Sequence, residues 1–153
     1  MKKSQRIKTI VDIKARQEKN ALEVLGAVQK KRLDMQAQIA GLRSYCQEYQ
    51  LRFEQLGGKG VNVAQLLEFR SFIDKLDKAI TGQEQALGSI ETELTAKRKI
   101  WEELHHKTQS LQKVCDAALL VEMQQEAKRE QLEQDERASR IGRNNSNGMG
   151  NAS

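Results

Sequence analysis

The sequence contains no proline, and aromatic residues make up only 4% of its 153 residues. Without proline, helices can run for long stretches, because proline is the residue that most strongly interrupts them. Because aromatic residues are so scarce and charged residues reach 31%, the chain lacks the material for a large globular core. These absences favour an elongated helical protein whose surface is mostly in contact with water.

Long apolar runs are also absent, and none approaches the ~20 residues needed to span a bilayer. The N-terminal Met1-Lys2-Lys3 leads into a charged amphipathic stretch and not into the apolar core of a secretory signal. Both cysteines, Cys46 and Cys115, are expected to stay free, since the predicted fold places them on the order of 60 Å apart. Free cysteines suit a reducing compartment, so we expect a cytoplasmic protein.

A stripe of apolar residues is the main positive signal. From Ile7 to Leu56 it follows alternating steps of four and three residues, and twelve of its fifteen positions are apolar. Glycines between Gly57 and Gly60 interrupt it, and it resumes from Phe69 to Ala118. A mean step of 3.5 residues is typical of a coiled-coil seam, because it keeps one stripe of each helix against its partner.

The sequence therefore predicts an all-α fold, an antiparallel two-helix coiled-coil hairpin over residues 4–141 with an overhanging second helix. Helix one covers about 4–56, the turn 57–62 and helix two about 63–141. Ser4 and Asn62 are the predicted N-caps of the two helices. Residues 142–153 are small and polar, so we expect a disordered tail.

The overhang begins where helix one runs out of partners. If the chain turns near residue 59 or 60, residue i lies opposite roughly residue 119 − i, so the second helix has no partner from about 117 to 141. The base of this overhang is apolar nearly all around the helix, at Ala117, Ala118, Leu119, Leu120, Val121 and Met123. A helix that exposes such a turn usually binds a partner.

Positive charge is concentrated at the N-terminus. Residues 1–32 carry ten Lys or Arg and three Asp or Glu, a net charge of +7, while the whole chain carries +5. Such a segment attracts acidic protein, anionic lipid or nucleic acid, although it is more often a solvated face. A basic coiled-coil protein that binds nucleic acid or acts as a structural adaptor is therefore the alternative interpretation.

Catalytic motifs are missing, so we do not expect an enzyme, a cofactor or a metal. The sequence has no phosphate-binding glycine loop and no nucleophile elbow. Overlapping Glu-x-x-His spacings occur at Glu102, Glu103, His105 and His106. A di-iron bundle needs two such motifs on separate helices, so we interpret this cluster as a solvated face.

Several segments together resemble the FliJ family of bacterial flagellar export proteins. They are LRSYCQEY at Leu42–Tyr49, LLEFRSFIDKLDKAITGQE at Leu66–Glu84, IWEELHHKTQSLQK at Ile100–Lys113 and REQLEQDERASR at Arg129–Arg140. The order and spacing of these segments about the glycine turn carry the resemblance, which covers residues 5–141.

The resemblance implies a non-enzymatic component of the flagellar type III export apparatus with a fold similar to the stalk subunit of rotary ATP synthases. It implies that the protein binds the export ATPase FliI and promotes assembly of its ring, contacts the export gate protein FlhA and escorts export chaperones. The ATPase regulator FliH is a further candidate partner. Neither a small-molecule substrate nor nucleic acid is expected. The implied location is cytoplasmic, peripheral to the inner membrane at the flagellar basal body.

The family's gate-binding residues fall, by position, at Gln38, Leu42, Tyr45, Tyr49, Phe72, Leu76, Ala79 and Gln83. Tyr45 and Phe72 lie just off the predicted seam and are the expected exposed anchors, whereas Leu42, Tyr49, Leu76 and Gln83 lie on it and could equally be core. The base of the overhang, at Ala117, Leu120, Val121 and Met123, is the candidate contact with the ATPase ring.

Overall fold

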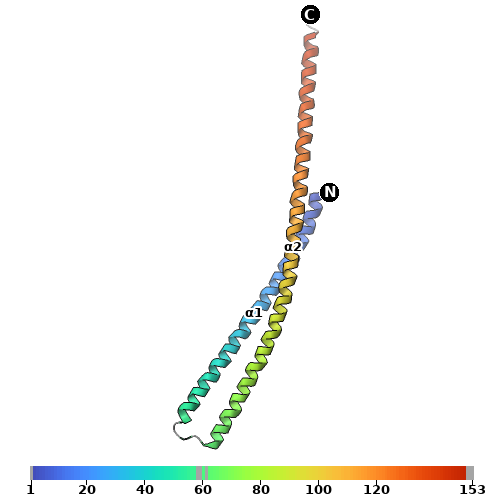
Figure 1. Cartoon of the computed structure of the whole chain (residues 1–153). Coiled ribbons are helices and arrows are strands. Elements are labelled where there is room, and N and C mark those ends of the chain that lie inside the picture. The colour runs from blue at the N-terminus through green and yellow to red at the C-terminus, as the bar shows by residue number, and fades with distance from the viewer. Residues whose placement is uncertain (1, 58–59, 61, 151–153) are drawn as a thin grey trace. The chain divides into compact units, whose positions relative to one another are not determined.

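The computed structural model describes residues 2–57, 60 and 62–150, and these form two helices and no strand (Figure 1). Helix α1 covers Lys3–Gly57, 55 residues, and α2 covers Val63–Gly150, 88 residues. The two helices pack against each other, so the predicted all-α helical hairpin is confirmed. The chain divides into two compact units, one formed by residues 1–15 and 106–153 (unit 1), the other by residues 16–105 (unit 2).

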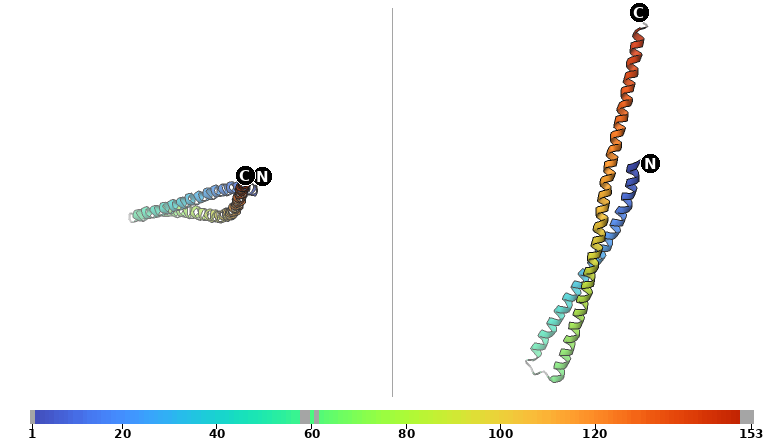
Figure 2. Two further views of the ribbon diagram at one scale, coloured as in Figure 1. Left: turned by 90° about the horizontal axis from the view of Figure 1, so that it is seen from above. Right: turned by 45° about the vertical axis from the view of Figure 1, so that its right-hand side comes forward.

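Unit 2 is the closed part of the hairpin. Its segments of α1 and α2 run antiparallel on either side of the turn, as the two views of Figure 2 agree. Leu25 and Val28 on α1 and Leu94 on α2 form its core, with 6%, 3% and 4% of their surfaces exposed, and Ile90 and Trp101 pack against them. These residues lie on the predicted seam, so the burial follows from the heptad spacing.

The predicted seam agrees with the observed burial almost residue by residue. In unit 2, every α1 residue that is not exposed belongs to the predicted stripe. On α2 the same holds apart from three additions, Phe72, Ala86 and His105. Leu56 is the exception on α1, since 60% of its surface is exposed beside the turn. A period of 3.5 residues was therefore enough to locate the core.

Residues on both sides of the turn explain how the chain reverses. The side chain of Asn62 accepts a hydrogen bond from the amide of Gln65 at 2.8 Å, and the Gln65 side chain accepts one from the amide of Asn62 at 3.4 Å. This reciprocal cap confirms Asn62 as the N-cap of α2. Gly60 has a φ of 84°, which glycine adopts at little cost. The predicted turn residues 58, 59 and 61 lie outside the described residues.

Unit 1 pairs the first turns of α1 with the part of α2 that starts at His106. Val11 and Cys115 are its buried apolar residues. Ser4 is hydrogen-bonded to Glu122, so helix-to-helix contact extends to Glu122, and the unpaired part of α2 begins about six residues later than the predicted 117. From 123 to 148 every residue is exposed, and α2 continues well past the start of α1 (Figure 2).

The extra contact reaches past the predicted partner of Ser4. Contacts across unit 2 join residues whose numbers add up to between 117, for Tyr45 with Phe72, and 127, for Arg43 with Glu84. In unit 1, Ser4 contacts both Cys115, the partner that the rule 119 − i predicts, and Glu122, seven residues further along α2. Helix-to-helix contact therefore extends about two helical turns beyond the predicted partner.

The C-terminal segment differs from its prediction as well. Residues 142–150 continue α2, whereas the sequence predicts a disordered tail from 142. The segment has no proline, and once a helix is formed each added residue extends the hydrogen-bond ladder by one bond. The Ser146 hydroxyl also donates to the carbonyl oxygen of Arg143 at 3.0 Å. Residues 151–153 of the predicted tail lie outside the described residues.

Candidate functional site

Five aromatic rings line the two helices of unit 2 toward the turn, and we call them the aromatic ladder. Phe53 stacks on Phe69 with ring centroids 3.8 Å apart, and Tyr49 stacks on Phe69 at 5.5 Å. Phe72 lies 4.4 Å from Tyr49 and meets Tyr45 edge-on at 6.1 Å. Most of the chain's few aromatic residues are thus gathered in one contact network, which rigidifies this end of the hairpin.

The eight predicted gate residues, all in unit 2, differ in accessibility. Leu76 is buried, with 8% of its surface exposed, so it faces the seam. Tyr45 has 48% exposed and is the ladder residue most open to water. Leu42, Tyr49, Phe72 and Gln83 are half-buried, and Gln38 and Ala79 are exposed. The structure therefore brings Tyr45, Tyr49 and Phe72 together and turns Leu76 away from the surface.

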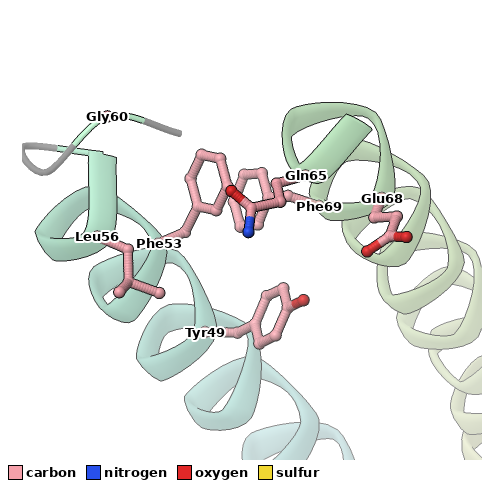
Figure 3. A pocket seen from close by; sticks show the side chains of 7 residues that line it. All are labelled: Tyr49, Phe53, Leu56, Gly60, Gln65, Glu68 and Phe69. Carbon is pink, nitrogen blue, oxygen red and sulfur yellow. The ribbon is translucent and has the colours of Figure 1, made fainter. Parts of the chain in front are cut away.

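A cavity of about 330 Å³ opens beside the ladder, next to the turn. Figure 3 shows the rings of Phe53 and Phe69 side by side, with the Tyr49 ring near them and the Glu68 carboxylate on the α2 side. The cavity is lined by Tyr49, Phe53, Leu56, Gly60, Gln65, Glu68 and Phe69. It combines the aromatic surface of the ladder with the polar side chains of Gln65 and Glu68.

The predicted ring-contact residues lie on α2 in unit 1 and are exposed. Leu120, Val121 and Met123 have 57%, 51% and 60% of their surfaces exposed. Ala117 is exposed too, and neighbouring Leu119 has 48% exposed. We call Ala117, Leu120, Val121 and Met123 the ring-contact surface. Apolar exposure of this extent, concentrated in about two turns, is typical of a binding surface.

Ser4 anchors the start of α1 beside this surface. Its hydroxyl donates to one carboxylate oxygen of Glu122 at 2.6 Å, and its amide donates to the other at 3.1 Å. These bonds lower the pKa of the Glu122 carboxyl, the hydroxyl bond contributing most. The Cys115 thiol also contacts Ser4, with its sulfur 3.6 Å from the Ser4 carbonyl oxygen.

This geometry corrects the predicted role of Ser4. Helix α1 begins at Lys3, and the amide of Arg6 bonds to the carbonyl of Lys2, so Ser4 lies inside the first turn and is not the N-cap. Ser4 instead contributes an orphan amide that Glu122 satisfies from the other helix. Sequence reasoning missed this contact because Glu122 looked like the first polar residue of an unpaired helix.

One member of the Glu–His cluster departs from its prediction: Glu102, Glu103 and His106 are exposed as expected of a solvated face, but His105 is not. His105 is half-buried, stacks on Trp101 at 5.0 Å and bonds through Nδ1 to the Glu18 carboxylate at 2.5 Å. His105 therefore belongs to the packed seam and not to a solvated face, because Glu18 occupies a seam position and needs a polar partner. Across residues 2–57, 60 and 62–150, no group of three or more His, Cys, Asp or Glu side chains could hold a metal ion.

Two further ion pairs join the helices of unit 2. Arg43 pairs with Glu84, and Arg32 lies 3.9 Å from Glu91. Both pairs are well exposed, so each contributes little to stability. Within the part of the chain that the structure describes, no helix has the length and apolar character required to cross a membrane.

Comparison with known proteins identifies the family. A family model described as "Flagellar FliJ protein" matches residues 2–147. Neither the curated proteins nor the solved structures gave a match. The family match covers α1, the turn and α2 as far as residue 147, including the aromatic ladder and the ring-contact surface. The chain therefore belongs to the FliJ family and is a protein of the flagellar export system.

Proposed function

We propose that this protein acts as the stalk-like component of the flagellar export apparatus. In this proposal unit 1 binds the export ATPase FliI and promotes assembly of its ring, and the exposed edge of the aromatic ladder contacts the export gate protein FlhA. The observation that carries the proposal is the exposed apolar run from Leu119 to Met123 on α2, in a chain that belongs to the FliJ family.

The composition of α2 in unit 1 supports this role. A stalk that works inside a ring needs a few apolar anchors on a mainly polar helix, so that it binds without locking to one subunit. The ring-contact surface supplies the anchors, and from Gln124 to Gly148 the helix is exposed and mostly polar. Leu132 and Ile141, 64% and 61% exposed, are isolated from that surface.

Tyr45 supports the proposed gate contact. It is half-exposed and its ring rests edge-on against Phe72, so it presents an aromatic anchor held in place by a second ring. Rigid aromatic anchors of this kind dominate the binding energy of many interfaces.

In the proposal the protein works in the cytoplasm at the inner membrane, escorts export chaperones and contacts the ATPase regulator FliH.

FliI turnover and ring assembly test the proposal. We expect wild-type protein to stimulate ATP hydrolysis by FliI, and we expect the combined variant Leu120→Ser, Val121→Ser and Met123→Ser to lose that stimulation. The matched control is Leu132→Ser with Ile141→Ser, which removes equally exposed apolar residues of the same helix. Equal stimulation by both variants would contradict the assignment of the surface.

These point variants test the ring-contact surface more specifically than a truncation does. Ending the chain after Val114 deletes the ring-contact surface, but it also removes Cys115 and Glu122, which hold Ser4 in place. Ending it after Arg129 keeps both, so this shorter protein should still stimulate FliI.

Nucleic-acid binding is the second candidate function, because the first 32 residues carry a net charge of +7. A mobility-shift assay with duplex DNA at physiological salt measures it directly. If the protein shifts DNA and leaves FliI turnover unchanged, the export proposal fails and the nucleic-acid function replaces it.

A further inference from the structure

We propose that the start of α1 and the facing turns of α2 form a double groove that binds an acidic segment bearing apolar side chains. The inference rests on the proposed function, because it specifies the chemistry of the partner that binds unit 1. Two shallow cavities, Ser4 and three lysines carry it.

The first groove has a mainly apolar floor. Its volume is about 500 Å³, and Val114, Ala117, Ala118 and Val121 of α2 line it together with Glu122 and Gln125. Val114 and Val121 have 49% and 51% of their surfaces exposed. The residue that α1 contributes to this groove is Lys3, which is exposed. The groove therefore offers apolar contact with one positive charge at its rim.

The second groove, of about 300 Å³, has the same construction. Cys115 and Leu119 of α2 supply its apolar lining, and two exposed lysines, Lys2 just before α1 and Lys8 within it, supply positive charges. Ser4, Gln5 and Glu122 complete the wall. Glu122 is the one residue common to both linings, so its bonds to Ser4 stand between the two grooves.

The charge of the grooves determines which partner fits. The Glu122 carboxylate is directed at Ser4 and engaged by two hydrogen bonds, whereas three lysines surround the grooves. A partner carboxylate placed over Lys3 or Lys8 makes a favourable charge interaction, and an adjacent apolar side chain of the partner is buried against the apolar lining of the groove. A positively charged partner meets repulsion at every rim.

The apolar lining of the grooves also favours a protein partner over nucleic acid. Phosphate contacts require only the lysines, because the phosphate backbone has no apolar side chain to bury. Exposed Val114, Leu119 and Val121 beside those lysines fit a segment that alternates carboxylates with apolar residues. The occupant we infer is therefore an acidic amphipathic segment of the ATPase.

The first experiment reverses the rim charges. Binding of FliI is measured for Lys2→Glu with Lys3→Glu and Lys8→Glu, and for the matched control Lys19→Glu with Lys30→Glu and Lys31→Glu. The control makes the same charge change at exposed lysines of the same helix. We expect the first variant to weaken binding about tenfold or more and the control less than about threefold. Similar losses in both variants would overturn the groove and leave the proposed function standing.

Folding of the first variant needs its own readout. Glutamate near a helix N-terminus favours the helix, so α1 should still form. The thiol of Cys115 is buried beneath Ser4, and its reaction rate with a thiol reagent in a Cys46→Ser background reports whether that turn stays docked. A variant that binds weakly while its thiol stays protected has lost charge and not structure.

A second experiment is independent of FliI. The probes are a synthetic helical peptide of about four turns built from Glu and Leu, the same peptide with Gln in place of Glu, and a short DNA duplex. We expect the Glu peptide to bind, the Gln peptide to bind at least about fivefold more weakly, and Leu119→Ser with Val114→Ser to weaken Glu-peptide binding.

The outcomes separate the two claims. Binding of the Glu peptide without any binding of FliI contradicts the proposed function but supports the groove. Equal binding of both peptides, or binding of neither, overturns the groove. DNA binding that depends on the lysines but not on Leu119 and Val114 overturns it in favour of nucleic acid.

Discussion

Two hydrogen bonds join Ser4 to Glu122 across the two helices of unit 1, one donated by the serine hydroxyl at 2.6 Å and one by the serine amide at 3.1 Å. The contact gives an unpaired amide of the first turn of α1 an acceptor from α2. It also leaves only 7% of the Ser4 surface exposed. Glu122 thereby attaches the first turn of α1 to α2.

The pH dependence of this contact follows from the Glu122 carboxyl. Its pKa is lowered from the ordinary 4.5, mainly by the Ser4 hydroxyl. Because the folded pKa is depressed, the stabilisation is fully present above pH 4.5 and is lost as the pH falls below that value through the folded pKa. We expect the protection of the Ser4 amide in hydrogen exchange, normalised to its intrinsic rate, to decline over this acidic range.

Glu122→Gln is the control for that prediction. Glutamine keeps one oxygen acceptor and cannot titrate, so protection of the Ser4 amide should be lower at neutral pH and should no longer change on acidification. If the amide of the variant follows the same pH profile as wild type, another group is responsible.

The core of unit 2 should respond to loss of a single seam side chain. Leu94 has 4% of its surface exposed and packs with Leu25 and Val28, so Leu94→Ala should lower the free energy of unfolding by about 2–5 kcal/mol. Leu33→Ala, at a position with 65% exposed, should change it by less than about 0.5 kcal/mol. Urea unfolding followed by circular dichroism measures both, and equal effects would contradict the seam.

Two glycine substitutions should have opposite signs. Gly82 lies within α2, and apart from its chain neighbours and the nearby backbone of its own helix no atom lies within 4 Å of an added Cβ, so Gly82→Ala should stabilise the protein by about 0.5–1 kcal/mol. Gly60 has a φ of 84°, so Gly60→Ala should destabilise it by about 1–2 kcal/mol. Thermal unfolding of the two variants gives the signs directly, and a stabilising Gly60→Ala would mean that the turn adopts another conformation.

Substitution of Tyr45 should weaken gate binding without affecting stability, whereas substitution of Phe72 should affect both. Tyr45→Ala removes a half-exposed ring and should weaken binding to the cytoplasmic domain of FlhA by about 2 kcal/mol with helicity unchanged. Phe72→Ala should weaken binding and also reduce stability, because Phe72 contacts both tyrosines. Titration calorimetry with circular dichroism separates the two effects, and full binding by Tyr45→Ala would exclude it as an anchor.

The helices and the seam were predictable from sequence because they depend on local spacing. A stripe repeating every 3.5 residues identified Leu25, Val28, Ile39 and Leu94 as core, and all four are buried. The exposed apolar run at Leu119–Met123 was visible for the same reason. Neither inference needs knowledge of which residues face each other across the hairpin.

The polar contacts were not predictable because they depend on the relative alignment of the helices. The pairing rule sets Ser4 opposite residue 115, seven residues before Glu122, so Glu122 looks unpaired. His105 was misplaced for a related reason, since its burial follows from Glu18 lying opposite it. Alignment of this kind is determined by the turn, part of which lies at residues 58, 59 and 61.

The polar residues on the seam restrict the register of the hairpin. A slip of one heptad keeps apolar stripe against apolar stripe, so leucines and valines alone cannot prevent it. In unit 2 such a slip could set His105 against Leu25 and separate it from the Glu18 carboxylate. Because a charge facing an apolar residue is costly, Glu18 and His105 act together to select one alignment among several that the heptads allow.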